Sequence, residues 1–157
     1  MFKRILVPVD GSETSAKALA AAVKLARQNN GRLRLVNVLE SLAVADSFGA
    51  YGSYSEEMVR ALREGGESAL STGKAVAQAA GIEADTMLYE KFGQRLGEVV
   101  AEAAKLWNAD LVVVGTHGRR GVRRLFLGSG AEDVIRLAPV PVLVFRSEDA
   151  PDVTSGA

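Results

Sequence analysis

The residues best suited to bind an anion lie in one glycine-rich stretch, residues 115–130, with the sequence GTHGRRGVRRLFLGSG. Gly115 and Gly118 have no Cβ, so their backbone can approach a ligand closely. Gly128 and Ser129 precede a predicted helix, whose free N–H groups and positive dipole end favour a phosphate. The Ser129 hydroxyl can donate to a phosphate oxygen or cap its own helix. The stretch therefore predicts a phosphate site made mostly of backbone amides.

The spacing of these glycines distinguishes the stretch from two common phosphate-binding motifs. No Gly-Lys-Ser/Thr closes it, so it is not a P-loop. It is not G-x-G-x-x-G either, because Asp133 follows Gly128 and Gly130 where the third glycine would stand. The pattern is instead G-x2-G-x9-G-Ser.

Other polar side chains near this stretch leave alternatives open. Asp10 follows a predicted strand, where it can accept hydrogen bonds from a ligand or serve only as a turn residue. His117 has no evident acid, base or nucleophile partner, so its backbone is the expected contributor. Four arginines can either reach a phosphate or form a solvated flap; they are Arg119, Arg120, Arg123 and Arg124.

Strands and helices that must position these residues alternate along the chain. Expected strands are residues 2–9, 33–39, 82–90, 110–114 and 140–145, and expected helices are residues 12–30, 56–80, 94–108 and 129–137. This alternation predicts a doubly wound α/β fold, a parallel sheet with helices on both faces. Ligands bind such sheets at the carboxyl ends of the strands, so the loops after the first and fourth strands matter most.

Several residues predict where these elements begin, end or lie in the sheet. Ser12 is expected to cap the first helix, and Gly31 to adopt the left-handed conformation at its end. Gly81 ends the second helix. Acidic residues in 82–90 and Pro141 in the last strand favour positions at the sheet edges.

Length and composition indicate one domain over residues 1–146, followed by a tail, 147–157, expected to be disordered. The chain has 157 residues, of which 48% are hydrophobic, enough for a core of its own. The loop at 41–55 is long, and it can be a packed crossover, a lid or a partner contact.

Charge and residue counts exclude several functional classes. Lys+Arg and Asp+Glu both total 19, so a broad basic face for nucleic acid is not expected. With no cysteine and one histidine, the chain offers no disulfide framework, thiolate nucleophile or multi-histidine metal site. No secretion signal and no apolar run of membrane-spanning length is visible, which favours the cytoplasm.

Together with VPVDGS at residues 7–12 and VPVLV at 140–144, the glycine motif resembles the universal stress protein family over residues 2–146. The resemblance implies a five-stranded sheet in the order 3-2-1-4-5, a homodimer formed through the last strand, and ATP binding. It implies that Pro8, Val9 and Asp10 lie beside adenine and ribose, and that Val38 flanks the base. It further implies phosphate and ribose contacts from Gly115, Thr116, His117, Gly118, Gly128, Ser129, Gly130 and Ala131.

Two residues depart from the family pattern: Gly130 stands where valine is common, and Asn37 where histidine is frequent. Gly130 should keep the amides and loosen the helix start. Asp10 would repel a triphosphate, so a ribose contact is expected for it unless Mg²⁺ lies between.

The leading hypothesis is an ATP-binding stress sensor with little or no catalysis, whose nucleotide state alters its dimer or an unidentified protein partner. Phosphoryl transfer needs a positioned nucleophile as well as charge clamps, and the sequence offers only candidate clamps. The alternatives are a slow ATPase or nucleotidyl transferase, or an interaction module without nucleotide.

Overall fold

The computed structural model describes residues 1–39, 55–91, 93–116 and 129–146. The strands are β1 (Arg4–Pro8), β2 (Arg32–Val38), β3 (Ala84–Tyr89), β4 (Leu111–Gly115) and β5 (Val142–Phe145). The helices are α1 (Glu13–Asn29), α3 (Glu56–Ala79), α4 (Leu96–Trp107) and α5 (Ser129–Leu137). The expectations for the loop at 41–54, the four arginines and the tail fall outside the described residues.

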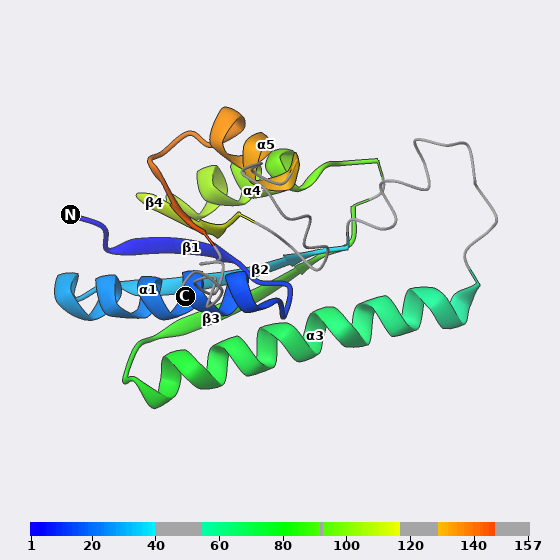
Figure 1. Ribbon diagram of the computed structural model, residues 1–157, viewed down its shortest axis with the longest axis horizontal. Helices are drawn as coiled ribbons and strands as arrows, with labels where there is room; N and C mark the ends of the chain where they lie inside the picture. Colours follow the sequence, from blue (N-terminus) through cyan, green and yellow to red (C-terminus); the bar gives the residue numbers. More distant parts are fainter. Residues whose placement is uncertain (40–54, 92, 117–128, 147–157) are drawn as a thin grey trace, which may run out of the picture.

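All five strands are parallel and lie in the order β3-β2-β1-β4-β5, which confirms the predicted fold and order. The weak strand β3 and the proline-preceded strand β5 occupy the two edges, as expected. α1 and α3 cover one face of the sheet, and α4 and α5 cover the other (Figure 1).

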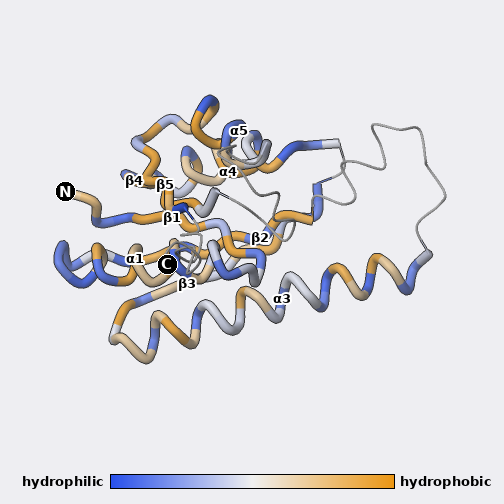
Figure 2. The backbone as a smooth tube through the Cα atoms, viewed as in Figure 1, coloured by the Kyte–Doolittle hydropathy of each residue, from blue (hydrophilic) through white to orange (hydrophobic). Residues whose placement is uncertain are grey.

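Alternating strand residues build two apolar layers, one on each face of the sheet. Ile5 and Val7 pack toward α1 and α3, whereas Leu6 packs toward α4 and α5. All three are fully buried. Figure 2 shows the same arrangement, with hydrophobic strands between helices that alternate hydrophobic and hydrophilic residues.

Helix α1 begins as predicted but ends differently. The Ser12 Oγ accepts a hydrogen bond from the Ser15 N–H at 3.2 Å and caps the helix. The left-handed residue at its end is Asn30, with φ 50°, so the expectation for Gly31 was wrong. Gly31 instead allows close packing, because a Cβ there would lie 3.0 Å from the carbonyl oxygens of Phe2 and Lys3.

Two glycines that lower the helix propensity of α3 lie where this helix contacts the sheet. Gly66 and Gly73 are buried, and a Cβ at Gly66 would lie 2.5 Å from Asn37 Oδ1. Among the described helices, none is both long enough and apolar enough to cross a membrane.

Candidate functional site

The adjacent strands β1 and β4 form the switch point of the sheet. They pair in parallel, with Ile5 beside Leu111 and Leu6 beside Val112. From β1 the chain passes through α1 on one face, and from β4 it continues to α5 on the other (Figure 1). In sheets of this kind the crevice for a ligand opens where the connections diverge, at the carboxyl ends of the strands.

The turn after β1 fixes the carboxylate of Asp10. Its Oδ1 accepts a hydrogen bond from the Ser12 N–H at 2.8 Å, and its own N–H donates to the Ser15 Oγ at 3.2 Å. Gly11 adopts φ 80°, a conformation that residues with a Cβ rarely adopt. One carboxylate oxygen of Asp10 is thus held by the turn, and the side chain stays half-buried.

Asn37 on β2 holds Val9, the residue that follows β1, in place. The Val9 N–H donates to the Val36 carbonyl at 2.8 Å, and the Asn37 Nδ2 donates to the Val9 carbonyl at 2.7 Å. Both Val9 and Asn37 are buried. The sequence identified Asn37 only as a departure from the family, although a polar residue between Val36 and Val38 in an apolar strand was a usable signal.

The end of β4 packs tightly against the first turn of α1. A Cβ at Gly115 would lie 2.8 Å from the carbonyl carbon and oxygen of Thr14, so a larger residue would force the backbone apart. Thr116 is buried and donates its N–H to the Phe145 carbonyl at 2.8 Å. The close contact of Gly115 with Thr14 was not predicted.

Helix α5 begins at Ser129, as predicted, on the side of the sheet where β4 ends (Figure 1). Ser129 is exposed, Gly130 is half-buried and Ala131 is buried. The first N–H groups of a helix lack intrahelical acceptors, so this terminus can receive an anion. Glu132 adds an acidic side chain in the same turn.

The structure places most of the predicted site residues at the end of the sheet where the strands have their carboxyl ends. Pro8 is the last residue of β1, and Val9 and Asp10 follow it. Gly115 ends the adjacent strand β4, and Thr116 follows it. Val38, half-exposed, ends the neighbouring β2. His117, Gly118 and Gly128 lie outside the described residues.

Few protein groups at the carboxyl ends of β1 and β4 are suited to bind a cation. Within residues 1–39, 55–91, 93–116 and 129–146, no three His, Asp or Glu side chains gather as a metal site would require. The candidate edge offers the carboxylate of Asp10 and the hydroxyl of Ser129. A divalent cation held there would therefore need most of its oxygen ligands from a bound phosphate compound or water.

Comparisons with known proteins agree on one family. The family model described as "Universal stress protein family" matches residues 1–146. A protein of Staphylococcus aureus strain USA300 that carries the universal stress protein name is 34% identical over 150 residues, covering 96% of this chain and 87% of that protein.

Solved structures share the fold. A universal stress family protein from Burkholderia pseudomallei is 29% identical with a TM-score of 0.71, covering 93% of this chain and 97% of that one. A universal stress protein from Archaeoglobus fulgidus, solved in complex with dAMP, is 23% identical with a TM-score of 0.67, covering 92% and 98%.

Proposed function

Because the chain belongs to the universal stress protein family, we propose that it is a cytoplasmic ATP-binding regulator whose site lies at the carboxyl ends of β1 and β4. The observation that carries this proposal is that Asp10 follows β1, Gly115 ends the adjacent strand β4, and α5 is the next described element after β4, at the switch point of the sheet. Nucleotides bind doubly wound sheets at such points. The G-x2-G-x9-G-Ser motif at residues 115–129 supports ATP as the ligand.

Each part of the nucleotide has a group suited to it. Ribose hydroxyls would donate to the Asp10 oxygen that the turn does not engage, and the base would lie between Pro8 and Val38. Phosphate oxygens would accept from the amides and hydroxyl at Ser129 and Gly130, where the helix dipole favours negative charge. Backbone groups at His117, Gly118 and Gly128 complete this set in the proposal.

Mg²⁺ fits this arrangement as a companion of the phosphates. When bound, it would neutralise part of the triphosphate charge. The Asp10 carboxylate and the Ser129 hydroxyl are both hard oxygen donors of the kind that Mg²⁺ prefers. Their task in either case is to orient the nucleotide, and the dAMP complex of the Archaeoglobus relative supports an adenine nucleotide as the class of ligand.

The described side chains at the carboxyl ends of β1 and β4 agree with a regulatory role rather than with ATP turnover. Asp10 is tied into a turn by Ser12 and Ser15, which engage its backbone N–H and one of its carboxylate oxygens. Turnover of ATP that scales with protein and disappears in Asp10→Ala would contradict this part of the proposal.

A homodimer through β5 is the second part of the proposal. Three apolar side chains on and beside this edge strand are exposed: Ile135 at 44%, Leu137 at 40% and Leu143 at 37%. Val142 and Val144 instead pack against the core cluster of α4 and α5. Leu143 is therefore the position at which a charge would perturb the dimer rather than the fold.

Isothermal titration calorimetry with ATP, with and without Mg²⁺, tests the binding site. Wild type should release heat on binding, and Gly128→Val should not, because a branched side chain would block the phosphate site. Gly65→Val is the matched control, since a Cβ at Gly65 meets nothing within 4 Å; it should bind like wild type. Absence of ATP binding by wild type, or equal affinity in Gly128→Val, would contradict the proposal.

A further inference from the structure

Strand β3 leaves one side of its backbone open. The carbonyls of Glu83 and Tyr89 accept from the amides of Leu33 and Leu39 on and after β2. Because backbone groups of successive residues point to opposite sides of a strand, the odd-numbered residues of β3 face β2. The N–H and carbonyl groups of Ala84, Thr86 and Leu88 face outward, and no strand of the described chain lies beyond them.

This edge lacks the features that commonly prevent strands from pairing between molecules. Its sequence, ADTMLY, contains no lysine, arginine or proline, and such residues commonly protect edges. Its one charge, Asp85, is held by Arg34 through two hydrogen bonds of 2.6 and 2.9 Å. Met87, on the same face as Asp85, is 40% exposed. β3 thus offers a neutral, open edge with an apolar side chain in its centre.

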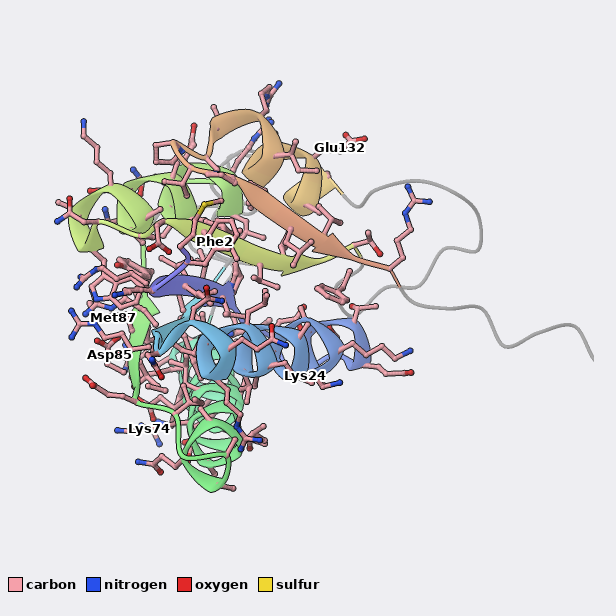
Figure 3. All side chains as sticks on the ribbon, turned by 90° about the vertical axis from the view of Figure 1, so that its left-hand side faces the viewer. Phe2, Lys24, Lys74, Asp85, Met87 and Glu132 are labelled. Carbon is pink, nitrogen blue, oxygen red and sulfur yellow. The ribbon has the colours of Figure 1, made fainter. Side chains whose placement is uncertain are left out.

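A pocket of about 400 Å³ lies between this edge and helix α3. Its lining residues are Glu67, Leu70, Ser71, Lys74, Thr86 and Leu88. Neither Glu67 nor Lys74 has an ion-pair partner among the residues that the structure describes. In Figure 3, Lys74, Asp85 and Met87 all lie on the side of the molecule where β3 forms the border.

We propose that this edge pairs with the same edge of a second copy of the chain, antiparallel, around a twofold axis beside Met87. The sheets of the two copies then become continuous. Met87 lies opposite Met87 of the second copy, and Asp85 opposite its Tyr89. The outward backbone groups of Thr86 and Leu88 exchange hydrogen bonds with those of the second copy's Leu88 and Thr86.

The same axis brings the two α3 helices to packing distance. α3 contacts both β2 and β3, so it lies over the gap between these two strands, about half a strand spacing from β3. The twofold axis lies about half a strand spacing from β3 on its other, open side. With strands about 4.8 Å apart, the two helices are about 10 Å apart, a normal distance for packed helices. The second copy's α3 then closes the pocket.

Charge favours a second copy over an unrelated partner. Glu67 and Lys74 are seven residues apart, about two helical turns, on the pocket side of α3. The twofold axis passes α3 about midway between Glu67 and Lys74. The two antiparallel α3 helices therefore place Glu67 of each copy opposite Lys74 of the other. A register centred on Asp85 would instead oppose two like charges, which destabilises a strand pair.

Cysteine cross-linking tests this pairing directly, because the chain has no cysteine of its own. In an antiparallel pair without mutual hydrogen bonds, opposite Cα atoms are about 4.5 Å apart, within the range of a disulfide. Met87→Cys should therefore give a covalent dimer on mild oxidation. Leu106→Cys, at a position that is 72% exposed, is the control and should not. Met87→Cys that forms no covalent dimer, or cross-links no better than the control, would overturn the proposal.

A charge exchange provides a second test, measured by sedimentation velocity in a Leu143→Lys background that weakens association through β5. Lys74→Glu should raise the dissociation constant of the remaining dimer about tenfold, and adding Glu67→Lys should restore it. No dimer in this background, or no restoration by the second change, would count against the pairing. ATP binding is measured separately, so failure here leaves the nucleotide proposal standing.

Discussion

Replacing Asn37 by aspartate isolates one hydrogen bond that holds the end of β1. The Asn37 amide donates to the Val9 carbonyl at 2.7 Å, and both residues are buried. Asn37→Asp keeps the shape of the side chain, but a carboxylate cannot donate. The Val9 carbonyl would lose its donor and face a negative charge, so we expect the free energy of unfolding to fall.

The size of this effect depends on pH with a defined sign. The lost hydrogen bond and unsatisfied carbonyl cost about 1–3 kcal/mol. Burial raises the pKa of the introduced carboxyl above its unfolded value of about 3.9, and each unit adds about 1.4 kcal/mol at neutral pH. Below the unfolded pKa the carboxyl is protonated in both states and can donate to the Val9 carbonyl. The destabilisation relative to wild type should therefore be small near pH 3.5 and grow as pH rises to 7.

Urea unfolding of wild type and variant across this pH range measures the difference. Asn29→Asp is the matched control, because the Asn29 amide donates to the Leu25 carbonyl at 2.9 Å in a less buried position. Its effect should be smaller and should change less with pH than that of Asn37→Asp, because the carboxylate there stays partly solvated. A loss of stability in Asn37→Asp that does not change with pH, or no loss at pH 7, would refute the reasoning.

Three further predictions concern stability, ionisation and assembly. Gly115→Val should cost about 1–3 kcal/mol, because its Cβ would lie 2.8 Å from the Thr14 backbone; an unchanged denaturation midpoint would contradict it. Burial of Tyr89 is the main cause that raises the pKa of its phenol, and the charge of Arg34 lowers it by less. The contribution of the neutral phenol to folding stability should therefore be complete below the ordinary tyrosine pKa and be lost as pH rises above it. An absorbance titration should therefore lose its most alkaline tyrosinate step in Tyr89→Phe, and retention of that step would argue otherwise. Leu143→Lys should leave only the association through β3, so sedimentation should show smaller assemblies than for wild type; assemblies of wild-type size would reject the β5 interface.

Much of the fold could be predicted from the sequence because hydrophobic periodicity and turn residues agree. The run from Leu111 to Val114 is wholly apolar and forms an interior strand, whereas β3, with its acidic start, lies at an edge. The helix ends were less certain. Asn30 and Gly31 can both adopt left-handed conformations, and only the contact of Gly31 with Phe2 and Lys3 decides their roles.

The local structure of the candidate site was predictable where turn and helix-start residues mark it, and it was hidden where contacts across the sheet create it. The turn at Asp10 and the helix start at Ser129 follow from the local sequence, since turns and helix ends are local features. The bond from Asn37 to Val9 joins residues 28 positions apart, and the packing of Gly115 on Thr14 joins two separate elements. Such contacts depend on strand order and register, which single residues do not specify.

A crystal structure grown with excess ATP and Mg²⁺ tests the central claim most directly. The account predicts the triphosphate against the backbone amides between Thr116 and Ala131, with a ribose hydroxyl hydrogen-bonded to Asp10. Electron density for water alone at this edge, or for a nucleotide bound elsewhere on the protein, would contradict it.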